Sequence, residues 1–234
     1  MPFLILDLDL TVIVGDQYVE HIHRMHLLSN QFKSKRGPVT NCHIINPKKI
    51  ADLIETAYTH YDGVIILTSG YWDKGIRTLL ARKLDLSEKT GKKLEQCRIH
   101  SPITDSKLFN LDPEKIRFMK KNTRLKMIIK SCPELSKKCF TVLDDSLLHI
   151  NSFKHNKRVQ AVLATTNGPD DGFYKTAADA MEACLDQEAN MITNKKRTAS
   201  PERVLAQNHF FKRPKIEHVS HGYNLRDRPL LVPT

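Results

Sequence analysis

Two aspartates follow four apolar residues in the N-terminal stretch Phe3-Leu4-Ile5-Leu6-Asp7-Leu8-Asp9-Leu10-Thr11. A continuous apolar run is typical of a central strand in a parallel sheet, because both faces of such a strand are covered. Open α/β sheets bind ligands where the carboxyl ends of their strands enter loops, and Asp7 and Asp9 follow this strand at that edge. Two carboxylates this close repel each other, so they either share a proton or bind a cation. The stretch therefore predicts a site at a sheet edge.

The composition is that of a basic chain of 234 residues, with 37 lysines and arginines against 26 acids and a formal net charge of +11. This length suits one domain of ordinary size with a tail or an insertion. The charge favours polyanions, phosphorylated substrates or acidic membrane surfaces as partners. A solvated basic surface without a specific partner is equally compatible with it.

The cysteines and the hydropathy pattern indicate the compartment. The 5 cysteines are odd in number and form no CxxC pair, which is typical of reduced thiols in an intracellular protein. Acids interrupt the apolar run near the N-terminus, so we expect no classical secretory signal. No apolar stretch approaches the roughly 18 residues that a membrane-spanning helix needs. We therefore expect a cytoplasmic or nuclear protein without a transmembrane segment.

Apolar strands alternate with helices through the middle of the chain. The pattern predicts further strands at 64–67, 96–100, 139–143 and 159–164, and helices at 47–60, 72–84, 147–155 and 173–189. Asn46 is the expected N-cap of the helix at 47–60, and Asn122 or Thr123 that of one more helix. We expect a mixed segment at 12–40 and a loop at 101–113. This alternation predicts an α/β fold with a doubly wound, Rossmann-like parallel sheet and helices on both faces.

Polar residues follow two of the later strands. Thr68-Ser69-Gly70 comes just before a helix, where hydroxyls, free backbone N–H groups and the helix dipole favour an oxyanion, although it is also ordinary loop chemistry. Asp144-Asp145-Ser146 follows the strand at 139–143 and adds a second acid pair at the expected edge. One such pair is often only a loop cap. Two pairs with a hydroxyl and a lysine between them, in this order, are far more specific.

The order of these motifs resembles the haloacid dehalogenase (HAD) superfamily of phosphotransferases over roughly residues 3–165. The first motif is Asp7-Leu8-Asp9-Leu10-Thr11, the second is Thr68, and the fourth is Asp144-Asp145. The third motif is a lysine near the start of a helix. Lys121 matches the family spacing best, and Lys120 and Lys126 are the alternatives.

The resemblance implies a Mg2+-dependent phosphatase that acts through an aspartyl-phosphate. Asp7 would attack phosphorus, and Asp9 would protonate the leaving oxygen and then activate water. The remaining roles would be phosphate binding by Thr68, Ser69 and Lys121, and cation binding by Asp7, the backbone carbonyl of Asp9, and Asp144 or Asp145.

The size of the insertion indicates the substrate class. HAD members usually carry a cap domain that closes over small substrates, but only 56 residues separate Thr11 from Thr68, and the helix at 47–60 belongs to the core. We therefore expect a minimal cap that forms only a basic flap. The site beside it would be open and would admit a phosphoprotein bearing phosphotyrosine or phosphoserine. A nucleotide phosphatase, a phosphatase of nucleic-acid ends and a non-catalytic module that binds polyanions are the alternatives. We expect a monomer.

Two kinds of HAD protein phosphatase resemble this chain. The DLDxT opening is similar to the capless protein phosphatases of the polymerase C-terminal-domain type. The second kind is the HAD-like phosphotyrosine phosphatase that intracellular bacteria deliver into host cells, and it would place the protein in the host cell.

The chain changes character after the expected phosphatase domain at 1–190. Residues 191–234 carry 9 lysines and arginines against 3 acids without helical or strand periodicity, so we expect a disordered basic tail. Lys212-Arg213-Pro214-Lys215, with Lys195-Lys196-Arg197 upstream, is typical of a nuclear localisation signal and would contact importin. A nucleic-acid or acidic-lipid tether and a solvated linker are the alternatives.

Overall fold

The computed structural model describes residues 1–21, 26–33, 39–164 and 170–198, and for 20, 21, 33, 39, 40 and 194–198 it describes the backbone alone. Contacts between residues divide the chain into one unit of Met1–Thr193 and another of Asn194–Thr234. The first unit contains both sheets and the candidate site. Lys212-Arg213-Pro214-Lys215 and everything else from residue 199 onward lie outside the described residues.

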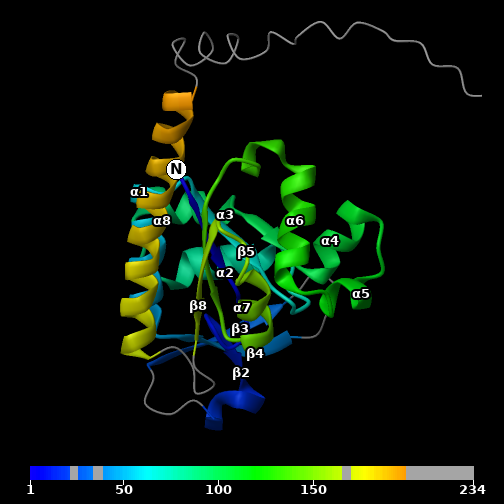
Figure 1. Cartoon of the computed structure of the whole chain (residues 1–234). Helices are drawn as coiled ribbons and strands as arrows, with labels where there is room; N and C mark the ends of the chain where they lie inside the picture. Colours follow the sequence, from blue (N-terminus) through cyan, green and yellow to red (C-terminus); the bar gives the residue numbers. More distant parts are fainter. Residues whose placement is uncertain (22–25, 34–38, 165–169, 199–234) are drawn as a thin grey trace, which may run out of the picture. The chain divides into compact units, whose positions relative to one another are not determined.

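A five-stranded parallel sheet forms the centre of the first unit, in the order β6-β5-β1-β7-β8 (Figure 1). Its strands are β1 Phe3–Leu6, β5 Gly63–Leu67, β6 Arg98–His100, β7 Phe140–Asp144 and β8 Val159–Leu163. Leu6 of the central strand pairs with Ile66 on one side and with Leu143 on the other. The chain runs outward from β1 to β6 and then returns to β7 and β8, which confirms the predicted doubly wound sheet. Because the order reverses beside β1, the loops after β1, β5 and β7 border the crevice where such sheets bind ligands.

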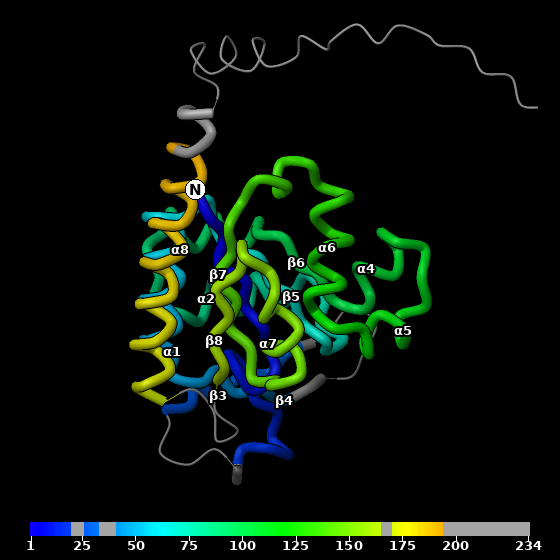
Figure 2. The backbone as a smooth tube through the Cα atoms, viewed as in Figure 1, coloured from blue at the N-terminus to red at the C-terminus, as the bar shows by residue number. Residues whose placement is uncertain are grey.

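Helices cover both faces of this sheet. They are α1 Pro47–His60, α2 Gly75–Lys83, α3 Glu88–Glu95, α4 Pro102–Phe109, α5 Pro113–Arg117, α6 Lys121–Ser131, α7 Leu147–Phe153 and α8 Asp171–Thr198, with short 3-10 turns η1 Asp16–His21 and η2 Pro133–Leu135. The helices α1 and α8 lie side by side on one face, while α6 and α7 lie on the other (Figures 1 and 2). Leu4 and Leu6 of β1 are buried toward α1 and α8, whereas Ile5 is buried toward α6. The first strand is therefore apolar without alternation because both of its faces are packed.

The segment between β1 and α1 forms a second, smaller sheet. Strands β2 Ile13–Gly15, β3 Leu27–Lys33 and β4 Val39–Ile45 pair antiparallel in the order β2-β4-β3. Phe32, Cys42 and Ile44 of this sheet are buried in the core beside α1. The insertion is small and its segment mixed, as predicted, since the described residues contain the turn η1 beside the strands. The pairing of these strands as a separate sheet was not predicted. Residues 34–38 lie outside the described residues.

The loop predicted for 101–113 is wrong, because α4 and α5 occupy most of it. Ser101 caps α4 in a capping box with Thr104, and Pro102 is its first residue. Asp112 accepts two backbone N–H bonds at the start of α5. Serine, aspartate and proline favour turns, but the same residue types also start helices.

The helix α1 spans the predicted residues 47–60, and Asn46 is its N-cap as predicted. Asn46 has a left-handed conformation with φ of 44°, and its side chain accepts the N–H of His26 rather than an N–H of the helix. Other helix boundaries differ from the prediction. The helix α2 begins at Gly75, three residues later than predicted, and α8 continues to Thr198. Among the described residues, no helix combines the length and the apolar character needed to cross a bilayer.

Candidate active site

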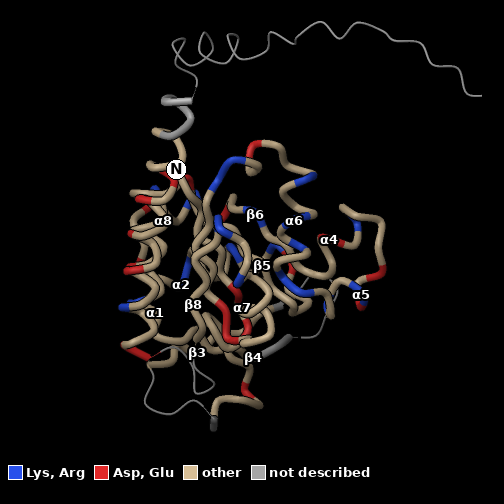
Figure 3. Tube along the Cα trace, in the orientation of Figure 1, with Lys and Arg blue, Asp and Glu red and all other residues tan. Residues whose placement is uncertain are grey.

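The predicted motif residues meet at one edge of the large sheet. Asp7 and Thr68 each follow a strand directly, and Asp144 ends β7. The backbone N–H of Asp7 donates to the carbonyl of Leu143 at 2.9 Å, so the first residue after β1 is still fixed by its neighbouring strand. Acidic positions lie at this end of the sheet near α7, and basic positions lie along α6 (Figure 3). The parallel register therefore brings together acids that are far apart in the sequence.

Lys121 lies between two of these acids. Its Nζ is 2.8 Å from Oδ1 of Asp7 and 2.7 Å from Oδ2 of Asp144. All three side chains are buried, with relative exposures of 1% for Lys121, 4% for Asp7 and 0% for Asp144. Lys120 and Lys126, the other candidates for the third motif, are exposed. The N-cap of α6 is Lys120 rather than the predicted Asn122 or Thr123, so Lys121 begins the helix and its side chain reaches the sheet edge.

The buried charges shift one another's protonation. Burial and then the charge of Asp7 raise the pKa of both Asp144 and Asp145, while Lys121 lowers them. Burial alone would lower the pKa of Lys121, but the charges of Asp7 and Asp144 outweigh it and leave this pKa above its ordinary value. The Lys121 ammonium therefore stays charged. It does not fully compensate the carboxylates of Asp144 and Asp145, because their pKa values stay above the ordinary value.

The acids fit a hard divalent cation. One carboxylate oxygen each from Asp7, Asp144 and Asp145 lies within 4.8 Å of the others. A few carboxylate oxygens, completed by water and phosphate, are the donor set that Mg2+ prefers. A bound cation would also relieve the repulsion that raises the pKa of Asp144 and Asp145. The predicted contribution of the Asp9 backbone carbonyl stays a prediction.

The carboxylate of Asp9 turns toward the loop after β5. Its Oδ2 accepts the hydroxyl of Thr68 at 3.0 Å, and its Oδ1 accepts the indole N–H of Trp72 at 2.9 Å. Burial and the charge of Asp7 raise the pKa of Asp9, although these two donors lower it. Leu10 follows in a left-handed turn with φ of 59°, and its N–H donates to Ile13. Thr68 donates its hydroxyl to Asp9 in this structure, and its predicted contact with phosphate stays a prediction.

Ser69 lies beside a histidine that the sequence analysis missed. Its Oγ is 3.4 Å from Nε2 of His149, on the first turn of α7. Burial and then the charge of Lys121 lower the pKa of His149 to about 4. A neutral imidazole therefore faces the hydroxyl predicted to bind phosphate. The feature of the sequence that could have identified His149 is its position four residues after Asp145.

Arg124 is a second residue that the sequence analysis missed. It is fully buried and donates to the carbonyl of Thr68 at 2.7 Å, to that of His100 at 3.1 Å and to Oδ2 of Asp105 at 2.8 Å. Asp105 also lies 2.7 Å from Nδ1 of His100. This cluster joins the ends of β5 and β6 to α4 and α6, so it positions the loop that carries Thr68. The feature of the sequence that could have identified Arg124 is its position one helical turn after Lys121.

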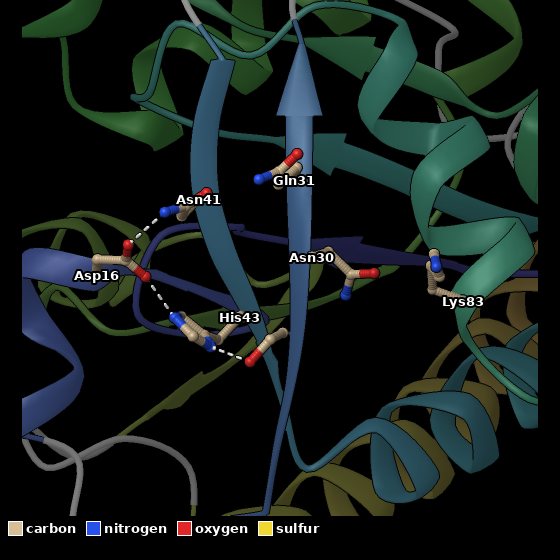
Figure 4. A pocket seen from close by; sticks show the side chains of 7 residues that line it. Asp16, Asn30, Gln31, Asn41, His43 and Lys83 are labelled. Atoms are coloured by element: carbon tan, nitrogen blue, oxygen red, sulfur yellow. Dashed lines mark hydrogen bonds and ion pairs between the residues drawn. The ribbon is translucent and has the colours of Figure 1, made fainter.

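A separate polar pocket lies on the small sheet (Figure 4). It has a volume of about 600 Å³ and is lined by Asp16, Ser29, Asn30, Gln31, Asn41, His43 and Lys83. His43 bridges the sheet, with Nε2 at 2.5 Å from Asp16 Oδ1 and Nδ1 at 3.0 Å from Ser29 Oγ. Asn41 donates to the other oxygen of Asp16 at 2.8 Å. These bonds fasten the start of η1 to β3 and β4, and the pocket shares no residue with the carboxylate cluster.

Comparison with known proteins finds few similarities. No protein-family model matches the chain, and no curated protein matches it. Among solved structures, the chain is similar to the fission yeast RNA polymerase II CTD phosphatase Fcp1, in a variant bound to beryllium fluoride, with 16% identity and a TM-score of 0.36. The match covers 93% of this chain and 58% of that one, so this chain spans little more than half of the phosphatase. A likeness of this size is not evidence of a shared activity.

Proposed function

We propose that the chain is a Mg2+-dependent phosphomonoesterase of the HAD type that hydrolyses phosphoproteins through an aspartyl-phosphate on Asp7. One observation carries the proposal: the buried contact of Lys121 with Asp7 and Asp144, next to an Asp9 that faces Thr68. The arrangement combines a nucleophile, a proton carrier and compensating positive charge, which are the parts that phosphoryl transfer requires.

The two acids of the first motif would have different roles in the reaction. A carboxylate oxygen of Asp7 would form a bond to phosphorus while the bond between phosphorus and the leaving oxygen breaks. Asp9 would give its proton to that leaving oxygen. Water would then attack phosphorus, Asp9 would take its proton, and Asp7 would be released with inorganic phosphate. The raised pKa of Asp9 supports this role, because a proton carrier must hold its proton near the working pH.

Positive charge would compensate the phosphoryl oxygens. Lys121 supplies a buried ammonium at the edge of the sheet. Asp7, Asp144 and Asp145 would hold Mg2+, and a bound Mg2+ would reduce the repulsion between the Asp7 carboxylate and the phosphate. Ser69 would donate its hydroxyl to a phosphate oxygen, since the neighbouring imidazole of His149 is neutral and can accept or donate.

A polypeptide substrate is supported by the rim around this edge. Tyr71 follows the Thr68 loop, and Arg117 lies 5.4 Å above its ring and 5.7 Å above that of Phe118. Phe118 is 78% exposed, and Leu147 and Leu148, just after the second acid pair, are also exposed. Exposed apolar side chains beside a polar site fit a protein partner better than a small sugar or nucleotide.

The test is an activity panel with Mg2+ on the wild type and Asp7→Asn, with the exposed Asp52→Asn as matched control. We expect the wild type to hydrolyse p-nitrophenyl phosphate and phosphopeptides, Asp7→Asn to be inactive and Asp52→Asn to match the wild type. Chelation of Mg2+ should abolish turnover. Absence of turnover by folded wild-type protein, or full activity of Asp7→Asn, would overturn the proposal. Preference for nucleotides or end-phosphorylated DNA over phosphotyrosine and phosphoserine peptides would overturn the substrate class alone.

A further inference from the structure

The chain's single tryptophan lies in the candidate active site. Trp72 belongs to the loop between β5 and α2, and its indole N–H donates to Oδ1 of Asp9 at 2.9 Å. Thr68, four residues earlier, donates to the other carboxylate oxygen at 3.0 Å. One short loop therefore supplies a donor to each oxygen of the same buried acid.

The loop is packed tightly enough to make this contact specific. A Cβ at Gly70 would lie 2.4 Å from Oδ2 of Asp9 and 2.7 Å from Nε1 of Trp72, so only glycine fits between them. The backbone N–H of Gly70 also donates to the hydroxyl of Thr68 at 3.0 Å, which orients that hydroxyl toward Asp9. The loop leaves the carboxylate little freedom to turn.

The small sheet restrains the indole from its other side. The ring centroids of Phe32 and Trp72 are 5.2 Å apart with an interplanar angle of 61°, an edge-to-face contact. Phe32 lies on β3 and is buried in the main core, so it is itself firmly held. A chain of direct contacts therefore leads from β3 through Phe32 and Trp72 to the carboxylate of Asp9.

We propose that Trp72 is a positioning residue for Asp9 and that Phe32 transmits the placement of the small sheet to this acid. The inference rests on the proposed function, in which Asp9 protonates the leaving oxygen. If the indole N–H holds one carboxylate oxygen, the proton on the carboxyl group is aimed at the substrate. Loss of that N–H leaves the acid present but poorly oriented.

A leaving-group comparison tests this role. A poor leaving group such as phenol needs the proton, whereas dinitrophenol departs without it, so Trp72→Phe should slow phenyl phosphate hydrolysis and spare dinitrophenyl phosphate. We expect kcat for phenyl phosphate to fall about tenfold or more, the worth of one hydrogen bond to a charged group. Phe32→Leu should show the same selectivity with a loss of about threefold. Asp52→Asn, at an exposed position of α1 outside the candidate site, is the control and should behave as the wild type on both substrates.

Equal losses on both substrates, or no loss on either, would overturn the inference. Because a single tryptophan is present, fluorescence gives a second readout that does not depend on turnover. Asp9→Asn and Phe32→Leu should each shift the emission of Trp72, and Asp52→Asn should not. Unchanged emission in Asp9→Asn, with native circular dichroism, would refute the contact even if Trp72→Phe failed to fold. A folded wild type without turnover would contradict the proposed function. The fluorescence measurement would still test the contact between Trp72 and Asp9.

Discussion

Lys121→Met removes the ammonium that lies between Asp7 and Asp144 and keeps a side chain of similar length. At an effective dielectric constant of about 20, each of its two contacts, at 2.8 and 2.7 Å, is worth about 6 kcal/mol. Burial of the ammonium offsets several kcal/mol of this sum. Because breaking a buried pair leaves uncompensated charge, we expect the variant to lose about 3–5 kcal/mol of unfolding free energy at about pH 8 without Mg2+.

The loss should depend on pH in a defined direction. The folded-state pKa values of Asp144 and Asp145 already lie above the ordinary 3.8, and removal of Lys121, which lowers them, raises them further. A carboxyl whose pKa is raised on folding stabilises the protein below its unfolded pKa, and this stability is lost as the pH rises through the folded pKa. The variant should therefore be closer to the wild type at about pH 5 than at about pH 8. Mg2+ should also recover part of the loss, since it supplies the missing positive charge.

The measurement is urea unfolding followed by circular dichroism at both pH values, with and without Mg2+. Lys126→Met, at an exposed position of the same helix, is the matched control and should stay within about 0.5 kcal/mol of the wild type. A loss below about 1 kcal/mol, the worth of a surface ion pair, would refute the reasoning. So would a loss that is the same at both pH values.

Three further predictions concern the same edge of the sheet. Arg124→Met should lose about 3–5 kcal/mol in urea unfolding, because the buried Asp105 then keeps only His100 as an ionisable partner among the described side chains and the carbonyl of Thr68 loses this donor; a loss under about 1 kcal/mol would contradict the assigned contacts. Metal-free wild type should melt at a lower temperature at about pH 8 than at about pH 5, because the raised pKa values of Asp144 and Asp145 make deprotonation unfavourable; a scanning calorimeter should show that Mg2+ reduces this difference. Gly70→Ala should slow hydrolysis of phenyl phosphate more than that of dinitrophenyl phosphate, since the added methyl crowds Asp9. An equal rate loss on both substrates, relative to the wild type, would disprove the tight packing.

Much of the fold and part of the site could be predicted from local patterns. Apolar runs predicted the central strands, and the acids at the ends of these runs, such as Asp7 just after β1 and Asp144 at the end of β7, had to lie at the edge where parallel strands end. The lysine could not be assigned in the same way. Three candidates lie within one segment, and the start of α6 at Lys121 depends on how the helix packs on the sheet.

The sequence by itself determined which segments form the central strands and which acids follow these apolar runs, because both depend on neighbouring residues. The order of the strands in the sheet needed the tertiary structure. Only the tertiary structure showed that Trp72 donates to Asp9, that Arg124 supports Thr68 and that the segment after β1 pairs as a small sheet. Most of these contacts join residues far apart in the chain, and only the pairing of β3 with β4 is local. Such contacts form only when helices and strands pack together, so no local pattern of residue types records them.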